Sequence, residues 1–390
     1  MIRLGKARGI VAIGAIAIIV AACGGGAATP APSAAAPATT APQTTAPETT
    51  APSAAAKTYT IGFSNTGGTG NGFREEQNCT AKAEALASGK VDKIDMIARD
   101  ADAAQQLADL RTLIAKSPDA IVFNPSNPDA LNVALDEAQA AGIVTVAVDA
   151  YVTDPETWKF YNNQIDYAYL GAKWLFDKIG GTGRVWYTRG IAGHPADSDR
   201  DTGFKKALAE NPGIEVVPNA DGVFTDWNPT TATNLANEFI SSGEYDKVDG
   251  IWTSGMDSQV VDAVKAAGKP YKPIVGADLG AFAAYLLDST NYAGLEGAAV
   301  TNTAAVGGAG VNLALKVLGG ETVTADPSAA YPNTVLLQPV LADNTTAEGR
   351  ALLESWKVDG LNPLWPLSVT IDGWTTYTAE QAVTCKGPGE

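Results

Sequence analysis

Short apolar runs alternate with longer amphipathic segments along most of this 390-residue chain, and this alternation constrains the fold more than any other feature. The apolar runs lie at residues 59–64, 93–98, 120–123, 143–148, 184–188, 214–217, 250–253 and 273–276. Helical patterns separate them at residues 102–116, 128–141, 167–179, 202–210, 230–241, 258–267 and 304–318. Strands that alternate with helices predict parallel sheets with helices on both faces.

The alternating region is long enough for two domains, and it predicts an α/β protein with two doubly wound, parallel-sheet lobes joined by a hinge. About 330 residues would make an unusually large single sheet, whereas two lobes match ordinary domain sizes. We expect an N-terminal lobe at residues 58–162 and 302–335, and a C-terminal lobe at 163–301 and 336–340. Residues 341–390 are expected to form a C-terminal strap.

The N-terminal residues differ sharply in composition from the rest. Residues 1–22 carry basic but no acidic side chains and contain a short apolar run, which predicts a signal peptide rather than a membrane span. The segment V-A-A-C ending at Cys23 resembles a bacterial lipobox, so we expect Cys23 to become the lipid-modified N-terminus. The alternative is an ordinary secretory signal with an incidental cysteine. The segment 23–57 is rich in Ala, Thr and Pro and lacks aromatic residues, which predicts a tether.

The net charge of the chain is −16, and the loss of the three basic residues of the signal peptide would take it to −19. Such a surface repels nucleic acid and anionic lipid headgroups, so both are excluded as binding partners. The membrane contact that we expect is through the lipid anchor only. The charge favours a small, neutral partner.

Polar and aromatic residues follow the ends of predicted strands, where ligands bind in open parallel sheets. They are Asn71, Phe73, Asn124, Asp149, Asn162, Asn163, Arg200, Trp227, Asp257, Asp278, Thr301 and Asn302. Carboxylates and amides bind hydroxyl pairs, arginine donates from a fixed fork, and an aromatic ring covers a C–H face, so this set is typical of a site for a neutral polyol. Each acid, amide or threonine alone is also explained as a helix cap or turn former, and Trp227 as a core anchor.

Six separated segments carry a resemblance to a known family. They are I-V-F-N-P-S-N-P-D-A-L at 121–131, G-I-V-T-V-A-V-D at 142–149, R-G-I-A-G-H-P-A-D-S-D-R-D-T-G-F at 189–204, D-G-I-W-T-S-G-M-D at 249–257, P-I-V-G-A-D at 273–278 and A-V-G-G-A-G-V-N-L-A-L-K-V-L-G-G at 305–320. In this order and spacing they resemble the periplasmic-binding-protein type 1 family, specifically sugar ABC transporter solute-binding lipoproteins similar to ribose-binding protein. The resemblance covers roughly residues 59–340.

The resemblance implies ligand contacts at particular positions. The matching residues are Asn71, Phe73, Asp149, Arg200, Trp227, Asp278, and Thr301 or Asn302. The predicted ligand-binding site also includes Arg74, at the position of a second family aromatic residue, and Asn163 and Asp257, which belong to the set that follows strand ends. The chain departs from the family where Arg74 replaces a second aromatic residue, Ala150 replaces an arginine and Met256 replaces an asparagine. These departures fit a sugar and put ribose itself in doubt.

The resemblance also implies a function. The chain would be the membrane-anchored solute-binding component of an ABC importer, which captures a pentose or hexose between its lobes and delivers it to the permease and ATPase subunits. It would act as a monomer without a cofactor, exported and lipid-anchored on the outer face of the cell membrane. An alternative with the same site is a sugar sensor that docks on a membrane receptor.

The residue content argues against an enzyme. His194 is the only histidine and no G-x-S-x-G segment exists, so a catalytic triad has no partner for it. Too few His and Cys residues are present for a zinc site, and we predict no metal. We expect His194 in a loop that faces solvent or the cleft edge. A secreted carbohydrate-active hydrolase stays an alternative because acids follow several strands, but nothing marks one of them as a catalytic acid.

Two cysteines, Cys79 and Cys385, are left once Cys23 is assigned to the lipid. An even pair in an oxidising, exported setting predicts a disulfide that pins the C-terminal tail to the first helix. The alternative is a pair of buried thiols. The tail also carries Trp356, Trp365 and Trp374, and we expect it to pack along the lobes as the strap.

Overall fold

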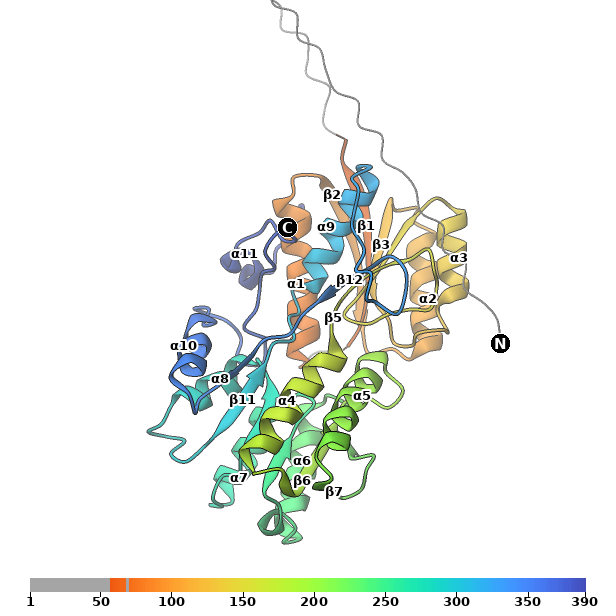
Figure 1. The fold of residues 1–390 in the computed structure, drawn as a ribbon. Coiled ribbons are helices and arrows are strands. Elements are labelled where there is room, and N and C mark those ends of the chain that lie inside the picture. Colours follow the sequence, from red (N-terminus) through yellow and green to blue (C-terminus); the bar gives the residue numbers. More distant parts are fainter. Residues whose placement is uncertain (1–56, 68–69) are drawn as a thin grey trace, which may run out of the picture. The chain divides into compact units, whose positions relative to one another are not determined.

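The computed structural model describes residues 57–67 and 70–390, which belong to one compact unit. The predicted signal peptide, Cys23 and nearly all of the predicted tether lie outside the described residues. The described part folds into two α/β lobes, which lie above and below one another in Figure 1. The predicted fold class is therefore confirmed.

The first lobe is built on a six-stranded parallel sheet with the order β12-β5-β4-β3-β1-β2. Its strands are β1 (Tyr59–Thr66), β2 (Val91–Arg99), β3 (Ala120–Asn124), β4 (Val144–Val148), β5 (Trp158–Asn162) and β12 (Thr334–Leu337). The sequence predicts β1 to β4, but β5 and β12 were missed.

Helices cover both faces of this sheet because successive strand residues point to opposite sides. The helices are α1 (Gly72–Ala87), α2 (Ala103–Ile114), α3 (Asn132–Ala140) and α9 (Val306–Leu318). Val122 packs in the cluster formed with α1 and α9, while its neighbours Ile121 and Phe123 pack in the cluster formed with α2 and α3. The lobe is thus doubly wound, with a separate apolar core on each face of its sheet.

The second lobe repeats this plan around a sheet with the order β13-β11-β10-β9-β6-β7, and β8 pairs with β6. Its strands are β6 (Thr182–Arg189), β7 (Gly213–Val217), β8 (Val223–Phe224), β9 (Gly250–Trp252), β10 (Ile274–Ala277), β11 (Gly297–Val300) and β13 (Leu341–Asp343). Its helices are α4 (Gln164–Lys178), α5 (Pro195–Glu210), α6 (Pro229–Ser241), η1 (Tyr245–Lys247), α7 (Asp257–Ala266), α8 (Gly280–Leu287) and α10 (Ala347–Ser355). Tyr187, Phe204 and Trp252 are fully buried at its centre, and the rings of Tyr187 and Phe204 stack with centroids 4.0 Å apart.

The chain crosses between the sheets after β5, after β11 and after β12. Backbone hydrogen bonds tie these crossings together. The Asn163 N–H donates to the Leu337 carbonyl at 2.8 Å, and the Thr301 N–H donates to the Val340 carbonyl at 2.9 Å. The Val340 N–H in turn donates to Thr301 Oγ1 at 2.8 Å. These hydrogen bonds therefore join the crossing segments into one layer between the lobes.

The C-terminal tail runs from the second lobe back to the first. Helix α10 lies on the second lobe, whereas α11 (Ala379–Thr384) lies beside α1 in Figure 1. The predicted disulfide between Cys79 on α1 and Cys385 after α11 is confirmed. One buried cluster joins the tail to α1, and it consists of Ala83 of α1 with Val369, Tyr377 and Ala382 of the tail. The tail is thus fastened to both lobes.

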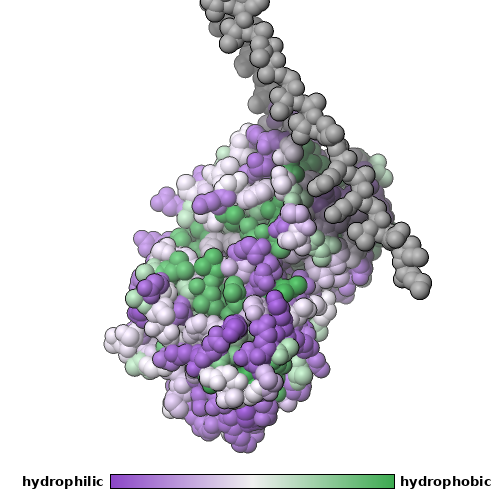
Figure 2. Space-filling view, viewed as in Figure 1, coloured by the Kyte–Doolittle hydropathy of each residue, from purple (hydrophilic) through white to green (hydrophobic). Residues whose placement is uncertain are grey.

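The exposed face in Figure 2 is mostly hydrophilic over the lower end of the second lobe, and hydrophobic residues gather nearer the level where the lobes meet. Across residues 57–67 and 70–390, none of the helices has the length and hydrophobicity that crossing a bilayer requires.

Candidate ligand-binding site

A cavity that is partly open to solvent lies between the two lobes, at the carboxyl ends of their strands. The first lobe lines it with Asn71, Phe73, Arg74 and Asp149. The second lobe contributes Arg200, Trp227, Ser254, Met256, Gln259 and Leu279. Asn302 lines it from a crossing segment, and Leu364 and Pro366 line it from the tail. Clefts between two domains are a common place for small-molecule sites.

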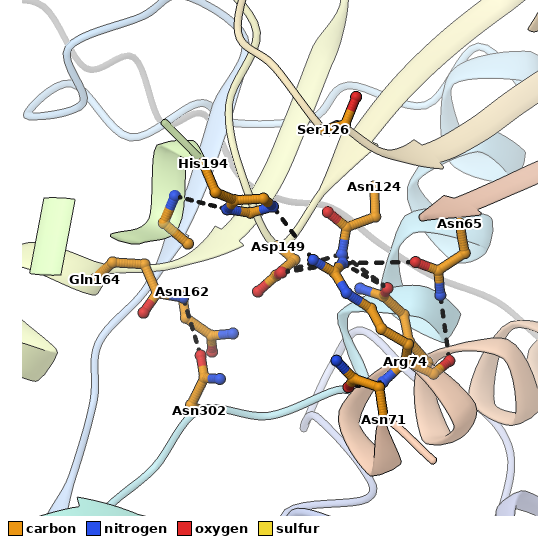
Figure 3. Close-up of polar contacts among 12 residues, drawn as sticks. Asn65, Asn71, Arg74, Asn124, Ser126, Asp149, Asn162, Gln164, His194 and Asn302 are labelled. Carbon is orange, nitrogen blue, oxygen red and sulfur yellow. Dashed lines mark hydrogen bonds and ion pairs between the residues drawn. The ribbon is translucent and has the colours of Figure 1, made fainter. Parts of the chain in front are cut away.

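Arg74 and Asp149 form a buried ion pair on the first-lobe side, with Arg74 Nη1 3.4 Å from Asp149 Oδ2. The side-chain amide of Asn124 donates to the same Oδ2 at 3.0 Å (Figure 3). Burial raises the pKa of the Asp149 carboxyl above its ordinary value, and the positive charge of Arg74 opposes this effect. The pair keeps a cation and an anion together at the cavity wall.

Polar residues at the start of α1 hold Arg74 in place. Asn71 caps the helix, because its Oδ1 accepts a hydrogen bond from the Arg74 N–H at 3.2 Å. The Arg74 guanidinium donates to Gln77 Oε1 at 3.4 Å and to Asn65 Oδ1 at 3.5 Å. Asn71 therefore both ends the preceding loop and faces the cavity.

Arg200 and Trp227 converge on one carbonyl of the second lobe. Arg200 Nη1 and Trp227 Nε1 each donate to the Ser254 carbonyl at 2.7 Å. Arg200 also donates from Nε to Gln164 Oε1 at 2.8 Å. Gly190 leaves room for the indole, since a Cβ there would lie only 2.1 Å from the ring. Both side chains are thus fixed before any ligand arrives.

His194 contacts both lobes from the start of α5. Its Nδ1 accepts from the Ala196 N–H at 3.2 Å, and its Nε2 lies 3.2 Å from Arg74 Nη2 of the first lobe. The imidazole meets the Trp227 ring edge-on at a centroid distance of 5.1 Å. Burial, together with the charges of Arg74 and Arg200, lowers the pKa of His194 well below its ordinary value. Of the two predicted positions, the solvent-facing one is wrong because the side chain is 3 % exposed, whereas the contacts with Arg74 and Trp227 agree with a position at the cleft.

A chain of hydrogen bonds links the second lobe to the crossing after β11. Gln164, which accepts from Arg200, donates from Nε2 to Asn302 Oδ1 at 2.9 Å. The Asn302 N–H donates to Asp278 Oδ1, also at 2.9 Å. Asn302 lines the cavity, but Asp278 does not. Burial raises the pKa of Asp278 to about 6, although hydrogen bonds from Asn302 and Ser368 oppose the shift.

Three further residues of the predicted site do not line the cavity. Asn163 caps α4 by accepting a hydrogen bond from the Asp166 N–H at 3.0 Å. Thr301 accepts one from the Val340 N–H of a neighbouring crossing segment. Asp257 Oδ1 accepts from Thr253 Oγ1 at 2.7 Å and from the Ala277 N–H at 3.1 Å. Burial raises the pKa of this fully buried carboxyl to about 7. Asn163 and Thr301 are thus engaged by neighbouring protein groups, whereas Asp257 Oδ2 is buried without a hydrogen-bond partner among the described residues.

The cavity also contains residues that sequence reasoning missed. Ser254 follows the end of β9 and Gln259 lies in the first turn of the helix after it, α7, so the strand-end rule could have found them. No comparable signal marked Leu364 and Pro366, because they lie in an irregular segment beyond the family resemblance. Leu279, one residue after Asp278, lines the cavity where the acid was expected.

The arrangement offers directional hydrogen bonds from both lobes and one indole ring. Amides, guanidinium groups and a carboxylate match hydroxyl groups, and the indole matches a C–H face. Within the described ranges, no cluster of three His, Cys, Asp or Glu side chains is placed to hold a metal ion.

Comparison with known proteins places the chain in a family of binding proteins. Residues 61–322 match the family described as periplasmic binding protein domain. A xylitol-binding protein of Mycolicibacterium smegmatis is 27 % identical over 250 residues, which cover 62 % of this chain and 69 % of that protein. The ribose import binding protein RbsB of Bacillus subtilis is 24 % identical over 166 residues, which cover 42 % of this chain and 53 % of that protein.

Solved structures show the same architecture. The crystal structure of an ABC transporter solute binding protein from Thermobispora bispora aligns with a TM-score of 0.67 and 26 % identity, over 79 % of this chain and 90 % of that one. These matches are to binding proteins rather than to enzymes. They confirm the predicted family and the prediction that the chain is not an enzyme.

Proposed function

The chain belongs to the periplasmic binding protein domain family, and on that premise we propose that it captures a small neutral sugar or polyol between its two lobes for an ABC importer. The observation that carries this proposal is the cavity itself, which is lined by hydrogen-bonding groups from both lobes and by the indole of Trp227.

The charges of the cavity favour a neutral ligand. Arg74 is paired with Asp149, and Arg200 donates to Gln164 and to the Ser254 carbonyl. Each guanidinium group therefore already has acceptors in the protein. A sugar would use the donor and acceptor positions that these contacts leave open. Hydrogen bonds to those positions are strong because one partner is charged.

The names of the relatives support the same ligand class. One is described as binding xylitol and another as a ribose import protein, so a polyol and a pentose both occur among them. The departures at Arg74, Ala150 and Met256 argue that the ligand of this chain is not ribose.

Capture would work by a change in the balance between open and closed lobes. A ligand that bonds to Asn71 and Asp149 on one lobe and to Arg200 on the other binds the closed arrangement better than the open one. It shifts the equilibrium by that difference in affinity. A permease would then recognise the closed form.

The remaining parts of the proposal concern location. We propose that the protein is exported, that Cys23 carries acyl chains, and that the segment up to residue 57 tethers a monomeric binding domain to the outer face of the membrane. Each buried CH₂ of an acyl chain contributes about 0.8 kcal/mol, so several chains give a stable anchor.

A thermal-shift screen of the purified protein against pentoses, hexoses, polyols, amino acids and small carboxylic acids tests the ligand class. A ligand at about 100 times its Kd stabilises the folded state by about 2.7 kcal/mol. We expect at least one sugar or polyol to raise the midpoint, with amino acids and acids inactive as controls. A midpoint that responds to none of the sugars and polyols would contradict the proposal.

A further inference from the structure

Part of the cavity wall comes from the C-terminal tail, at Leu364 and Pro366. This segment lies beyond residue 322, where the family match ends. Its contribution to the cavity wall can refine the ligand class. The inference that follows rests on the proposed function.

The tail is fixed to the second lobe at the start of α8. The Gly280 N–H donates to the Trp365 carbonyl at 2.8 Å, and the Ala281 N–H donates to the Pro363 carbonyl at 2.7 Å. The Leu367 N–H donates to the Asp278 carbonyl at 2.8 Å, and Leu279 and Pro366 form an antiparallel bridge. The segment thus lies along the end of β10 and over the acid that was expected to face the ligand.

The tail meets the first lobe at the start of α1. Gly72 has no room for a side chain, because a Cβ there would lie 2.1 Å from the Leu364 carbonyl oxygen. Trp365 Nε1 lies 3.5 Å from Glu75 Oε2 on the same helix. The wall formed by Leu364 and Pro366 is therefore held from both lobes.

This wall has no N–H group to offer a ligand. The Leu364 N–H donates to Asn362 Oδ1 at 3.0 Å, the Trp365 N–H donates to the Asn362 carbonyl at 2.9 Å, and Pro366 has no N–H. The residue paired with Pro366 across the antiparallel bridge, Leu279, also lines the cavity and has an apolar side chain. A hydroxyl group placed against the side chains of Leu364, Pro366 and Leu279 would lose its bonds to water without replacing them there.

The polar groups of the cavity are on other elements. Asn71, Arg74 and Asp149 lie on the first lobe, Arg200 lies on α5, and Asn302 lies on the crossing after β11. In Figure 3 Asn71 and Arg74 lie on one side of the view and Asn302 on the other, with Asp149 near the centre between them. One part of the cavity thus offers hydrogen-bonding groups, while the part covered by the tail offers apolar side chains.

We propose that the ligand is a deoxy sugar, which places a methyl group against Leu364 and Pro366 and its hydroxyl groups against Arg74, Asp149 and Asn302. A methyl group buries apolar surface at this wall, whereas the hydroxymethyl group of the parent sugar would bury an unpaired hydroxyl. The tail acts as the specificity-determining wall of the site.

Calorimetric titration of the purified protein with three matched pairs tests this proposal. The pairs are 6-deoxygalactose with galactose, 6-deoxymannose with mannose, and 6-deoxyglucose with glucose, each in both enantiomeric series. We expect the deoxy member of the pair that fits to bind at least tenfold tighter than its parent. Leu364 is only half-buried, so Leu364→Gln should fold and should reduce this preference to less than threefold. The exposed Leu86→Gln on α1 is the matched control and should keep the preference.

The outcomes separate the two proposals. If parent sugars, pentoses or polyols bind as tightly as the deoxy sugars, or if Leu364→Gln leaves the preference intact, the deoxy-sugar proposal is overturned while the proposed function stands. If no sugar or polyol of any kind binds, both proposals are overturned.

Discussion

At the scale of single residues, the burial of charge dominates the site. Arg74 and Asp149 are both buried, and each would be costly to bury alone. Burial lowers the pKa of Arg74 and raises that of Asp149, and each charge opposes the shift of the other. We therefore interpret the pair as a means of keeping hydrogen-bonding groups at the cavity wall, and not as a source of stability.

The first prediction concerns this ion pair. We expect Arg74→Met to lower the free energy of unfolding by about 3 kcal/mol at pH 7, because it leaves the Asp149 carboxylate buried without a counter-charge. Combining Arg74→Met with Asp149→Asn should restore most of the stability but not the sugar affinity. Urea unfolding and calorimetry of the wild type, the two single variants Arg74→Met and Asp149→Asn, and the double variant measure both quantities. Equal stability of the single variant and the wild type would contradict the prediction.

The second prediction concerns the buried acids behind the cavity. Asp257, with its pKa raised to about 7, keeps its proton in the folded state, whereas in the unfolded chain it loses the proton near its ordinary value of 3.8. The folded state therefore binds more protons between these values, and stability should fall as the pH rises from about 4 to 7. One such group contributes at most about 1.4 kcal/mol per pH unit.

Urea unfolding at pH 5 and pH 7 checks this sign. Asp278, whose pKa is about 6, should add to the same trend. Asp257→Asn removes the titrating group and should make the slope shallower, whereas Asp288→Asn on the surface serves as the control and should not. A slope that is identical in the Asp257 variant and the wild type would contradict the assignment.

Residue type and position identified part of the site from the sequence and could not identify the rest. Asn71 and Asn163 are both asparagine caps that follow a strand, yet Asn71 also lines the cavity and Asn163 faces Asp166 and Gln338. What separates them is the arrangement of the lobes, which no local pattern contains. Whether Asn71, Phe73, Arg74, Asp149, Arg200, Trp227 and Asn302 bind a ligand stays a prediction.

At the scale of elements, the C-terminal tail changes the character of the site. It leaves the second lobe after α10, passes the cavity at Leu364 and Pro366, and ends on α1 at the disulfide. It therefore connects the lobes in addition to the three crossings, and any opening of the cleft must displace or bend it.

The third prediction tests the contact between the tail and α1. Gly72→Ala should lower both stability and sugar affinity, because its Cβ would lie 2.1 Å from the Leu364 carbonyl oxygen and would push the tail away. Gly280→Ala touches the same segment from the other lobe, but its Cβ would have ordinary contacts at 3.5 Å and should be tolerated. Thermal unfolding and calorimetry of both variants measure the difference. The prediction is wrong if the two variants behave alike.

The fourth prediction concerns the disulfide. Cys79 and Cys385 are 306 residues apart, so the bridge restricts a very long loop of the unfolded chain. We expect Cys385→Ser to lower the unfolding free energy by about 2–5 kcal/mol. Guanidinium unfolding measures this loss, and the wild type should gain the mass of two hydrogens on reduction. Cys79→Ser is the matched control and should behave in the same way. An unfolding midpoint insensitive to reductant would contradict the prediction.

Strand prediction succeeded where a run of apolar, β-branched residues marks a central strand, as in β3 and β4. It failed for β11, whose sequence Gly297–Val300 consists of small residues and is buried only because β10 and β13 flank it. It also failed for β5 and β12, which pair with one another at the edge of the sheet. These segments become strands through partners distant in the sequence, so local composition could not reveal them.

At the scale of the whole molecule, two doubly wound lobes place their strand ends against a shared cavity. The central strands and helices, the disulfide and the family were all predictable because they depend on periodicity, on cysteine number and on several motifs in order. The contribution of the tail to the cavity was not predictable, because irregular backbone carries no periodic signal. The exact lobe boundaries and the movement of the lobes stay predictions.

The central claim is that a sugar binds in the cavity between the lobes, against the indole of Trp227. A calorimetric titration of the wild type and of Trp227→Ala with the sugar that gives the largest thermal shift tests it most directly. Trp356→Ala, at the end of α10 and outside the cavity, is the matched control. The account predicts one site per chain, an affinity reduced at least tenfold by Trp227→Ala, which is about 1.4 kcal/mol of binding free energy, and an unchanged affinity in the control. Equal affinity of the wild type and the folded Trp227→Ala variant would contradict it.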